Sequence, residues 1–414
     1  MSIDVRTRSV KDVRSLERDE ILDAVLPEAL AVHGDLAGRG CSYLGLPSLG
    51  FDVDGRTLTL TAEAGTLRLV SDIDAAHVVA HLASDALSDL LQDRQSTMGL
   101  AMTSRVKISA GDITDWISWE PVLRALLDGR KVHEAGDVTM VDVDGNELDL
   151  GRAFTADDDP REMAHFLEQA GFLHLRDVFG EAEMATLGAD VDEWLARAAP
   201  DDGASWWASD DAGQDHAVRV LFFYEKSAVL RSLLDRGRYR MVGDLTSDGH
   251  VHTGNAEGLV KPLGIVRGLS DLPWHKDCGQ GGHSYICNGL TTGISVTGAD
   301  RTSGALAVIP GSHRANTMAT GRDRRLDLQP IMLETRTGDV TVHCSDTLHR
   351  AHPPVDRPRK VVYSSFALPV RPGDEVAPDP RRRQQRAQLS NVQARIEAAD
   401  NEASRTRHQA GHRR

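Results

Sequence analysis

The second half of the chain is a succession of short apolar runs separated by turn residues, and this feature limits the folds open to it. Each run has about the length of one strand and is rich in β-branched or aromatic residues. The runs span residues 218–224, 258–266, 290–296, 304–310, 338–343 and 359–367. Such spacing predicts a two-sheet β-barrel or jelly roll, packed against the helices that precede it.

Local signals place those helices. Asp159 is a suitable cap for a helix that has Pro160 in its first turn, and Gly171 is a suitable stop for the same helix. A strand is expected over residues 172–179, and apolar residues at helical spacing predict a second helix over residues 184–195. The barrel and these helices therefore form one unit.

The N-terminal portion reads as a separate, small α+β unit. Residues 51–60 and 65–70 alternate apolar and polar side chains around turn residues, as paired strands do. Apolar residues at helical spacing predict one helix over residues 74–91, and another amphipathic helix is expected from Trp116 to Leu127. The sequence predicts a first domain over residues 1–150 on this pattern.

A segment rich in methionine, with Met98 and Met102, leads to a Gly111-Asp112 turn after the predicted hairpin and helix. This order over residues 50–130 resembles sterol-carrier-protein-like domains, and the resemblance implies an apolar lipid tunnel. The alternative is that Met98, Met102 and the tryptophans Trp116 and Trp119 are ordinary core residues. Both interpretations are open at this point.

Chain length indicates further domains, and net charge limits the classes of partner. A chain of 414 residues is too long for one ordinary core, so we expect a second domain over residues 151–370. Residues 371–414 are rich in arginine and poor in large apolar residues, which predicts a basic flexible tail. A net charge of −15 argues against nucleic acid or an anionic membrane as the main partner.

Targeting signals and disulfide patterns are not apparent. No apolar stretch approaches the length of a membrane span, and the first twenty residues lack the apolar centre of a signal peptide. The four cysteines show no spacing typical of disulfides or of metal binding. We therefore expect a cytoplasmic protein.

The second domain carries a ligand set for a metal. His275 and Asp277 are two residues apart, and His349 follows the strand-like run 338–343. Two histidines and one carboxylate are the set that holds non-haem Fe(II) on one face and leaves the other coordination positions open. His343 competes with His349 as the third ligand, and His352 is a further competitor.

Longer motifs surround these residues. They are Leu272–Asp277, Gly304–Arg314, Gly338–Val340 ahead of Leu348-His349, and Arg359-Lys360 at the head of the last run. Together they resemble the phytanoyl-CoA dioxygenase family over residues 160–369. The resemblance implies a double-stranded β-helix, the cupin-like jelly roll, and an oxygenase that depends on Fe(II), 2-oxoglutarate and O2.

By that resemblance His275, Asp277 and His349 are the iron ligands, and Arg359 binds the distal carboxylate of 2-oxoglutarate. Arg357 is the rival to Arg359, because the interval from His349 to Arg359 is one residue shorter than is common in the family. Arginine suits the task, since it binds a carboxylate through two charge-assisted hydrogen bonds. The presence of Asp277 argues against halogenation, which needs a small residue at that position.

The function expected from the sequence is hydroxylation of an apolar small molecule of the lipid, acyl thioester, steroid or terpenoid type. One alternative is a tailoring oxygenase that desaturates, epoxidises or rearranges its substrate. Another is a lipid-binding carrier whose oxygenase domain is degenerate, and a zinc hydrolase is a further use of the same ligands. Residues 201–254 are expected to cover the mouth of the barrel, and residues 279–283 to form a lid. Lys261 is expected to be a solvated surface residue, with binding of an acidic substrate group as the alternative.

Overall fold

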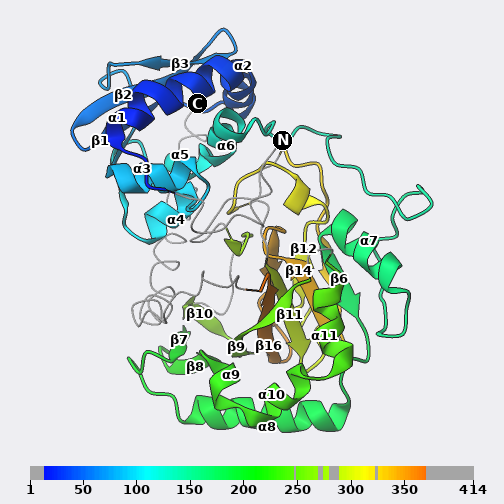
Figure 1. The fold of residues 1–414 in the computed structure, drawn as a ribbon. Helices are drawn as coiled ribbons and strands as arrows, with labels where there is room; N and C mark the ends of the chain where they lie inside the picture. Colours follow the sequence, from blue (N-terminus) through cyan, green and yellow to red (C-terminus); the bar gives the residue numbers. More distant parts are fainter. Residues whose placement is uncertain (1–13, 247–248, 269–273, 279–288, 322–324, 370–414) are drawn as a thin grey trace, which may run out of the picture. The chain divides into compact units, whose positions relative to one another are not determined.

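The computed structural model describes residues 14–246, 249–268, 274–278, 289–321 and 325–369 (Figure 1). The chain divides into two compact units. Unit 1 comprises Met1–Thr139, His275–Cys287 and Ser312–Leu328, and unit 2 comprises Met140–Trp274, Asn288–Gly311 and Gln329–Arg414. The lid predicted at 279–283 and the tail predicted at 371–414 lie outside the described residues. Within the described ranges, no helix combines the length and the apolar character needed to cross a bilayer.

Unit 1 is built around a sheet that has five strands among the described residues, in the order β3-β2-β1-β4-β5. The strands are β1 (Leu49–Val53), β2 (Arg56–Glu63), β3 (Thr66–Val70), β4 (Val78–Leu82) and β5 (Val106–Ala110). Neighbours pair antiparallel except β1 and β4, which run parallel after the crossover connection 71–77. The paired strands predicted within residues 51–70 are confirmed.

The helix predicted over residues 74–91 is correct only in its second half, which is α3 (Ser84–Leu91). The first half is strand β4, which pairs with β1 on one side and with β5 on the other. Val78 and Leu82 are four residues apart and fit one face of a strand as well as one face of a helix, because four is a multiple of two. Pairing with strands distant in sequence decides between the two.

Helices accompany this sheet. They are α1 (Arg18–Glu20), a π-helical turn (Ile21–Val25), α2 (Leu26–Leu44), α3, α4 (Thr97–Met102), α5 (Ile113–Ser118) and α6 (Glu120–Asp128). Met98, Met102, Trp116 and Trp119 are between 0% and 5% exposed, and both indole N–H groups donate to backbone carbonyls. These are the contacts of core residues. The resemblance to a sterol carrier therefore stays a prediction.

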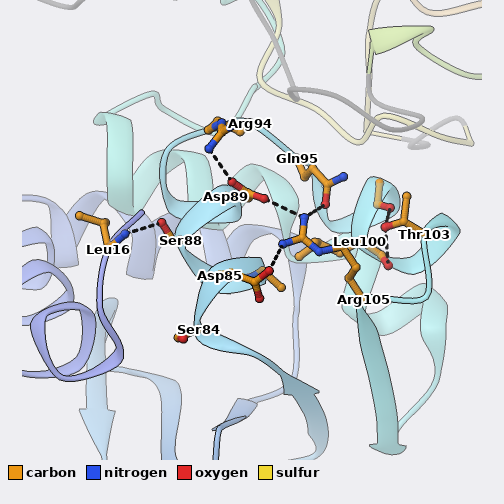
Figure 2. Close-up of polar contacts among 12 residues, drawn as sticks. Leu16, Ser84, Asp85, Ser88, Asp89, Arg94, Gln95, Leu100, Thr103 and Arg105 are labelled. Atoms are coloured by element: carbon orange, nitrogen blue, oxygen red, sulfur yellow. Dashed lines mark hydrogen bonds and ion pairs between the residues drawn. The ribbon is translucent and has the colours of Figure 1, made fainter. Parts of the chain in front are cut away.

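A surface network around Arg105 ties the start of β5 to α3 (Figure 2). The guanidinium lies 2.7 Å from an oxygen of Asp89, 3.0 Å from one of Asp85 and 2.7 Å from the amide oxygen of Gln95. Arg94 pairs with the other oxygen of Asp89 at 3.1 Å. The Arg105 side chain is 28% exposed, so water screens much of this attraction.

Residues from far along the chain complete unit 1. The backbone N–H of His133 donates to the carbonyl of Asn316 at 3.1 Å. The Asn316 amide donates in turn to the carbonyls of Pro121 and Arg130, at 2.9 Å and 2.8 Å. Asp327 accepts a bond from Nε2 of His133 at 2.8 Å. Unit 1 is therefore not a contiguous stretch of sequence.

Unit 2 is built on an antiparallel sheet that has eight strands among the described residues, in the order β10-β7-β8-β9-β16-β11-β14-β6 (Figure 1). The strands are β6 (Phe172–Leu175), β7 (Ser205–Asp210), β8 (Asp215–Val220), β9 (Val251–Lys261), β10 (Ile265–Gly268), β11 (Leu290–Ser295), β14 (Val340–Cys344) and β16 (Arg359–Ala367). A smaller sheet, in the order β13-β12-β15, consists of β12 (Leu306–Val308), β13 (Ile331–Leu333) and β15 (His349–Ala351). The expected mixture of helices with antiparallel sheets is confirmed.

The predicted strand runs form strands, with two exceptions. Residues 258–266 are divided by a turn between the end of β9 and the start of β10. Residues 218–224 leave the sheet after Val220 and enter α9 (Phe223–Lys226). The other helices of unit 2 are α7 (Pro160–Ala170), α8 (Glu181–Ala196), α10 (Ala228–Leu234) and α11 (Gly237–Asp244). Asp159 caps α7 by accepting the N–H of Arg161, and Gly171 ends it with a φ of 75°, as predicted.

The helices pack against one face of the large sheet. Their apolar residues form a single core cluster with Val362 and Phe366 of β16, among other strand residues. Because strand side chains alternate, Arg359, Val361 and Tyr363 point to the opposite face. That opposite face carries Arg359, the residue predicted from the sequence to bind the cosubstrate.

Candidate metal and cosubstrate site

His349 opens β15 and is only 6% exposed. The strand is held by pairing with β12, where Val308 lies opposite His349. Nδ1 of His349 lies 2.9 Å from the carbonyl oxygen of Thr347. A carbonyl can only accept, so Nδ1 carries the proton and Nε2 keeps a lone pair for a metal.

His275 and Asp277 share one short segment. His275 forms a bridge with Thr320, and the N–H of Lys276 donates to the carbonyl of Ala319 at 2.8 Å. Nε2 of His275 lies 3.4 Å from Oδ1 of Asp277. The histidine side chain is 6% exposed and the carboxylate 36%, so the pair joins a buried nitrogen to a more accessible oxygen.

The structure brings these residues into one group. One ligand atom from each of His275, Asp277 and His349 lies within 4.8 Å of the others, and among the described residues this is a group that could hold a metal ion. Bonds of about 2.0–2.2 Å to one ion place its ligands roughly 3–4 Å apart. Two neutral imidazoles and one carboxylate therefore suit Fe(II) in number, chemistry and spacing.

Arg359 is a buried cation. Its side chain begins β16 and is 2% exposed, and Nη1 donates to the carbonyl of Gly304 at 2.8 Å. Its Nε has no hydrogen-bond partner, and no carboxylate of the described residues pairs with it. A buried guanidinium is costly unless an anion compensates it.

Lys261 is a second buried cation, directly opposite Arg359 in the pairing of β9 with β16. It is 0% exposed, and Nζ donates to the carbonyls of Ala351 and His352 at 3.3 Å and 2.8 Å. The prediction that Lys261 is a solvated surface residue is wrong. Its burial results from a pairing of distant strands that single-sequence patterns do not show.

The rival residues lie in other settings. Arg357 is 54% exposed and is already paired with Asp300 on the surface. His343 is 1% exposed on β14, and its ring centroid lies 4.1 Å from that of His349, but it is not in the three-residue group. His352, the further competitor, is partly buried, and its carbonyl accepts from Nζ of Lys261 at 2.8 Å; it is also outside the three-residue group.

The start of β14 is fixed by a buried carboxylate. Asp339, with a side chain 1% exposed, accepts from Nε2 of His174 at 3.0 Å and from the N–H groups of Arg336 and Asp177 at 2.8 Å and 3.1 Å. Burial alone raises the pKa of Asp339, but the bonds from His174 and the two backbone groups outweigh it and leave the pKa below its usual value. The Gly-Asp motif therefore has a structural role in positioning the strand that carries His343.

Aromatic residues of the expected mouth region divide into two kinds. Trp206 and Phe223 are 2% and 0% exposed and belong to core clusters. Trp207 and Tyr224 are only partly buried. Selection of substrate by this region stays a prediction.

Two histidines and a carboxylate are the ligand set typical of non-haem Fe(II) oxygenases, and Arg359 lies buried with no carboxylate partner among the described residues. Residues 167–360 form a phytanoyl-CoA dioxygenase (PhyH) family domain. The domain over these residues is a non-haem Fe(II)/2-oxoglutarate-dependent oxygenase domain, as the sequence motifs predict.

Similar solved structures include enzymes of several activities. The non-heme alpha ketoglutarate dependent epimerase SnoN from nogalamycin biosynthesis is 21% identical, with a TM-score of 0.42 over 50% of this chain and 80% of that one. The carbocyclase SnoK from the same biosynthesis is 22% identical, with a TM-score of 0.42 over 52% and 87%. EctD from S. alaskensis, solved with 2-oxoglutarate and 5-hydroxyectoine, is 18% identical, with a TM-score of 0.44 over 58% and 87%. No curated protein matches the chain.

Proposed function

We propose that the chain hydroxylates an apolar small molecule at an Fe(II) centre held by His275, Asp277 and His349, with Arg359 as the anchor of 2-oxoglutarate. The large and the small sheet of unit 2 form the double-stranded β-helix of this proposal. O2 is the second cosubstrate. The function rests on the family domain for its class and on the following contacts for its residues.

The observation that carries the proposal is the pair of buried cations. Arg359 and Lys261 lie opposite each other on neighbouring strands, and like charges in such a pair repel. Carbonyl oxygens accept hydrogen bonds from both groups, but Nε of Arg359 has no partner in the part of the chain that the structure describes. A dicarboxylate such as 2-oxoglutarate supplies the missing anion, and a charge-assisted bond of this kind contributes about 1.5–3 kcal/mol.

Each residue has a definite task in this proposal. The Thr347 carbonyl fixes the tautomer of His349, so that Nε2 faces the metal. Lys261 donates to the carbonyls of Ala351 and His352, which lie two and three residues after the proposed ligand His349. When bound, Fe(II) with 2-oxoglutarate and O2 supplies an oxidant able to break a C–H bond. The protein decides which C–H bond lies near it.

The first test is an anaerobic titration of Fe(II) into protein with 2-oxoglutarate, monitored by the visible charge-transfer absorption of the chelate. We expect the absorption with the natural chain and its loss in His349→Ala. The matched control is His343→Ala, which removes a neighbouring buried imidazole outside the three-residue group. Loss of the absorption in His343→Ala but not in His349→Ala contradicts the ligand assignment.

The outcome of the reaction needs a separate measurement. With candidate apolar substrates under 18O2, hydroxylation places one heavy oxygen in the product and one in succinate. Desaturation or rearrangement leaves the product without heavy oxygen and supports a tailoring oxygenase instead. Binding of an apolar probe without any 2-oxoglutarate turnover, by protein that retains its fold, supports the carrier interpretation.

A further inference from the structure

Three polar side chains form a connected chain on the sheet of unit 1. Nε2 of His81 lies 2.6 Å from Oγ of Ser109, and Nδ1 of His81 lies 2.9 Å from Oδ2 of Asp52. A hydroxyl, an imidazole and a carboxylate linked in this order are the arrangement that activates a serine as a nucleophile. Neither the oxygenase reaction nor its proposed residues use them.

The sheet explains why these three residues meet. Asp52 and His81 are register partners in the parallel pair of β1 and β4, so their side chains share a face. On the other side of β4, the register of β5 shifts by one residue between the pairs Val79–Ala110 and Ala80–Ile108. Ser109 is the extra residue at this bulge, and bulges commonly redirect a side chain.

The hydrogen bonds fix the direction of proton transfer. Oδ1 of Asp52 accepts the N–H of Gly55 at 2.9 Å, which holds the carboxylate in the turn between β1 and β2. An ionised carboxylate only accepts, so Nδ1 of His81 carries the proton and Nε2 is the base. Nε2 then faces the hydroxyl of Ser109, from which it can take a proton.

The three hydrogen-bonded side chains are accessible to solvent. The side chains of His81 and Asp52 are 39% and 28% exposed, and Ser109 is exposed. Asp52 and His81 also line an open hollow of about 370 Å³ together with Lys107. Lys107 is the register partner of His81 on β5, so its cation shares their face and can attract a developing oxyanion.

We propose that Ser109, His81 and Asp52 form a second, hydrolytic site that cleaves small carboxylic esters. Ser109 Oγ bonds to the ester carbonyl carbon while its proton passes to His81 Nε2. The bond from that carbon to the alcohol oxygen breaks, and the leaving alcohol takes the proton from Nε2. Water then gives a proton to Nε2 and its oxygen to the acyl group, and Ser109 regains its proton as the acid leaves. Asp52 orients the imidazole throughout.

The test uses the full chain with excess chelator and without 2-oxoglutarate, so the iron site makes no contribution. We expect hydrolysis of p-nitrophenyl acetate, and a fluorophosphonate probe should label the peptide that contains Ser109. Ser109→Ala should lose the label and slow hydrolysis at least about 100-fold. Asp52→Asn keeps the nucleophile but disturbs the tautomer, so labelling at Ser109 should slow by a factor on the order of 10²–10⁴.

The control is Ser104→Ala, which removes a different exposed serine, one that lines the hollow beside Asp52 and His81. It should label and hydrolyse like the natural chain. The proposal is overturned if the probe labels the natural chain elsewhere or not at all, or if folded Ser109→Ala hydrolyses the ester at the natural rate. Either result would mean that the three residues are only a surface hydrogen-bond chain across strands.

Discussion

Two arginines, one in each unit, are almost fully buried but have opposite surroundings. Arg124 in unit 1 is 0% exposed and lies among carboxylates, 3.4 Å from Glu120, 3.6 Å from Asp93 and 3.0 Å from Asp128. Arg359 in unit 2 is 2% exposed and donates to a carbonyl, with Nε unpartnered among the described residues.

Under the proposed function, the difference separates a structural arginine from one that binds the cosubstrate. Three carboxylates more than balance the charge of Arg124, and burial raises the pKa of Glu120 although Arg124 opposes this. The folded chain therefore supplies carboxylate counter-ions to Arg124. Among the described residues no carboxylate pairs with Arg359, which agrees with the proposed binding of an anionic cosubstrate there.

The largest expected effect is on Arg124. Arg124→Met should lower the free energy of unfolding by about 3–5 kcal/mol, because buried carboxylates lose their cation. Chemical denaturation followed by circular dichroism measures the change. A loss below about 1 kcal/mol would contradict a structural role for this cluster.

The next effect concerns binding rather than stability. Arg359→Met should weaken the binding of 2-oxoglutarate by roughly 10- to 150-fold, which corresponds to about 1.5–3 kcal/mol of binding free energy. The free energy of unfolding without cosubstrate should change by less than about 1 kcal/mol, since no ion pair is broken. Calorimetric titration measures the affinity, and Arg357→Met is the surface control that should leave it unchanged.

Asp339 is an intermediate case, a buried charge satisfied by hydrogen bonds. Asp339→Asn should lower the free energy of unfolding at pH 7 by about 1–3 kcal/mol. Because the folded pKa is depressed, the contribution of the carboxylate is present above its unfolded pKa and is lost as the pH falls below about 4. Unfolding measured from pH 7 to pH 3 should therefore show the natural chain and the variant converging in acid. Parallel curves would contradict this linkage.

The smallest effect is expected at Arg105, the partly exposed arginine of Figure 2. Arg105→Ala should lower the free energy of unfolding by about 0.2–1 kcal/mol, and less in high salt, because solvent and ions screen its pairs with Asp85 and Asp89. Thermal denaturation at low and high salt tests this. A loss as large as that of Arg124→Met would remove the distinction between buried and exposed clusters.

Local signals in the sequence predicted local structure well. Asp159 and Gly171 bound a helix as expected, because a cap and a left-handed stop depend on neighbouring residues only. The motif residues His275, Asp277 and His349 do meet in one group, and Arg359 is buried at the head of its strand. Their resemblance to a family supplied this information, since spacing alone left His343 and Arg357 as alternatives.

Features that depend on distant pairing were missed. The strand at Val78 was taken for helix because its partner β1 approaches only through a crossover connection. Lys261 looked solvated because nothing near it in sequence reveals its position opposite Arg359. The link from Ser109 to Asp52 through His81 depends on a bulge and a parallel pair, which no periodicity of side chains can indicate.

Unit 1 is assembled from segments that are far apart in the sequence, and this affects its folding during synthesis. Pro121 and the Asn316 amide that bonds to its carbonyl lie 195 residues apart. At translation rates of 5–20 residues per second, the ribosome needs roughly 10–40 s to cover that interval. During this time the first 139 residues, although already synthesised, cannot form their full set of contacts and depend on chaperones or on their own sheet to avoid aggregation. For the same reason, a chain cut after Thr139 would omit part of unit 1.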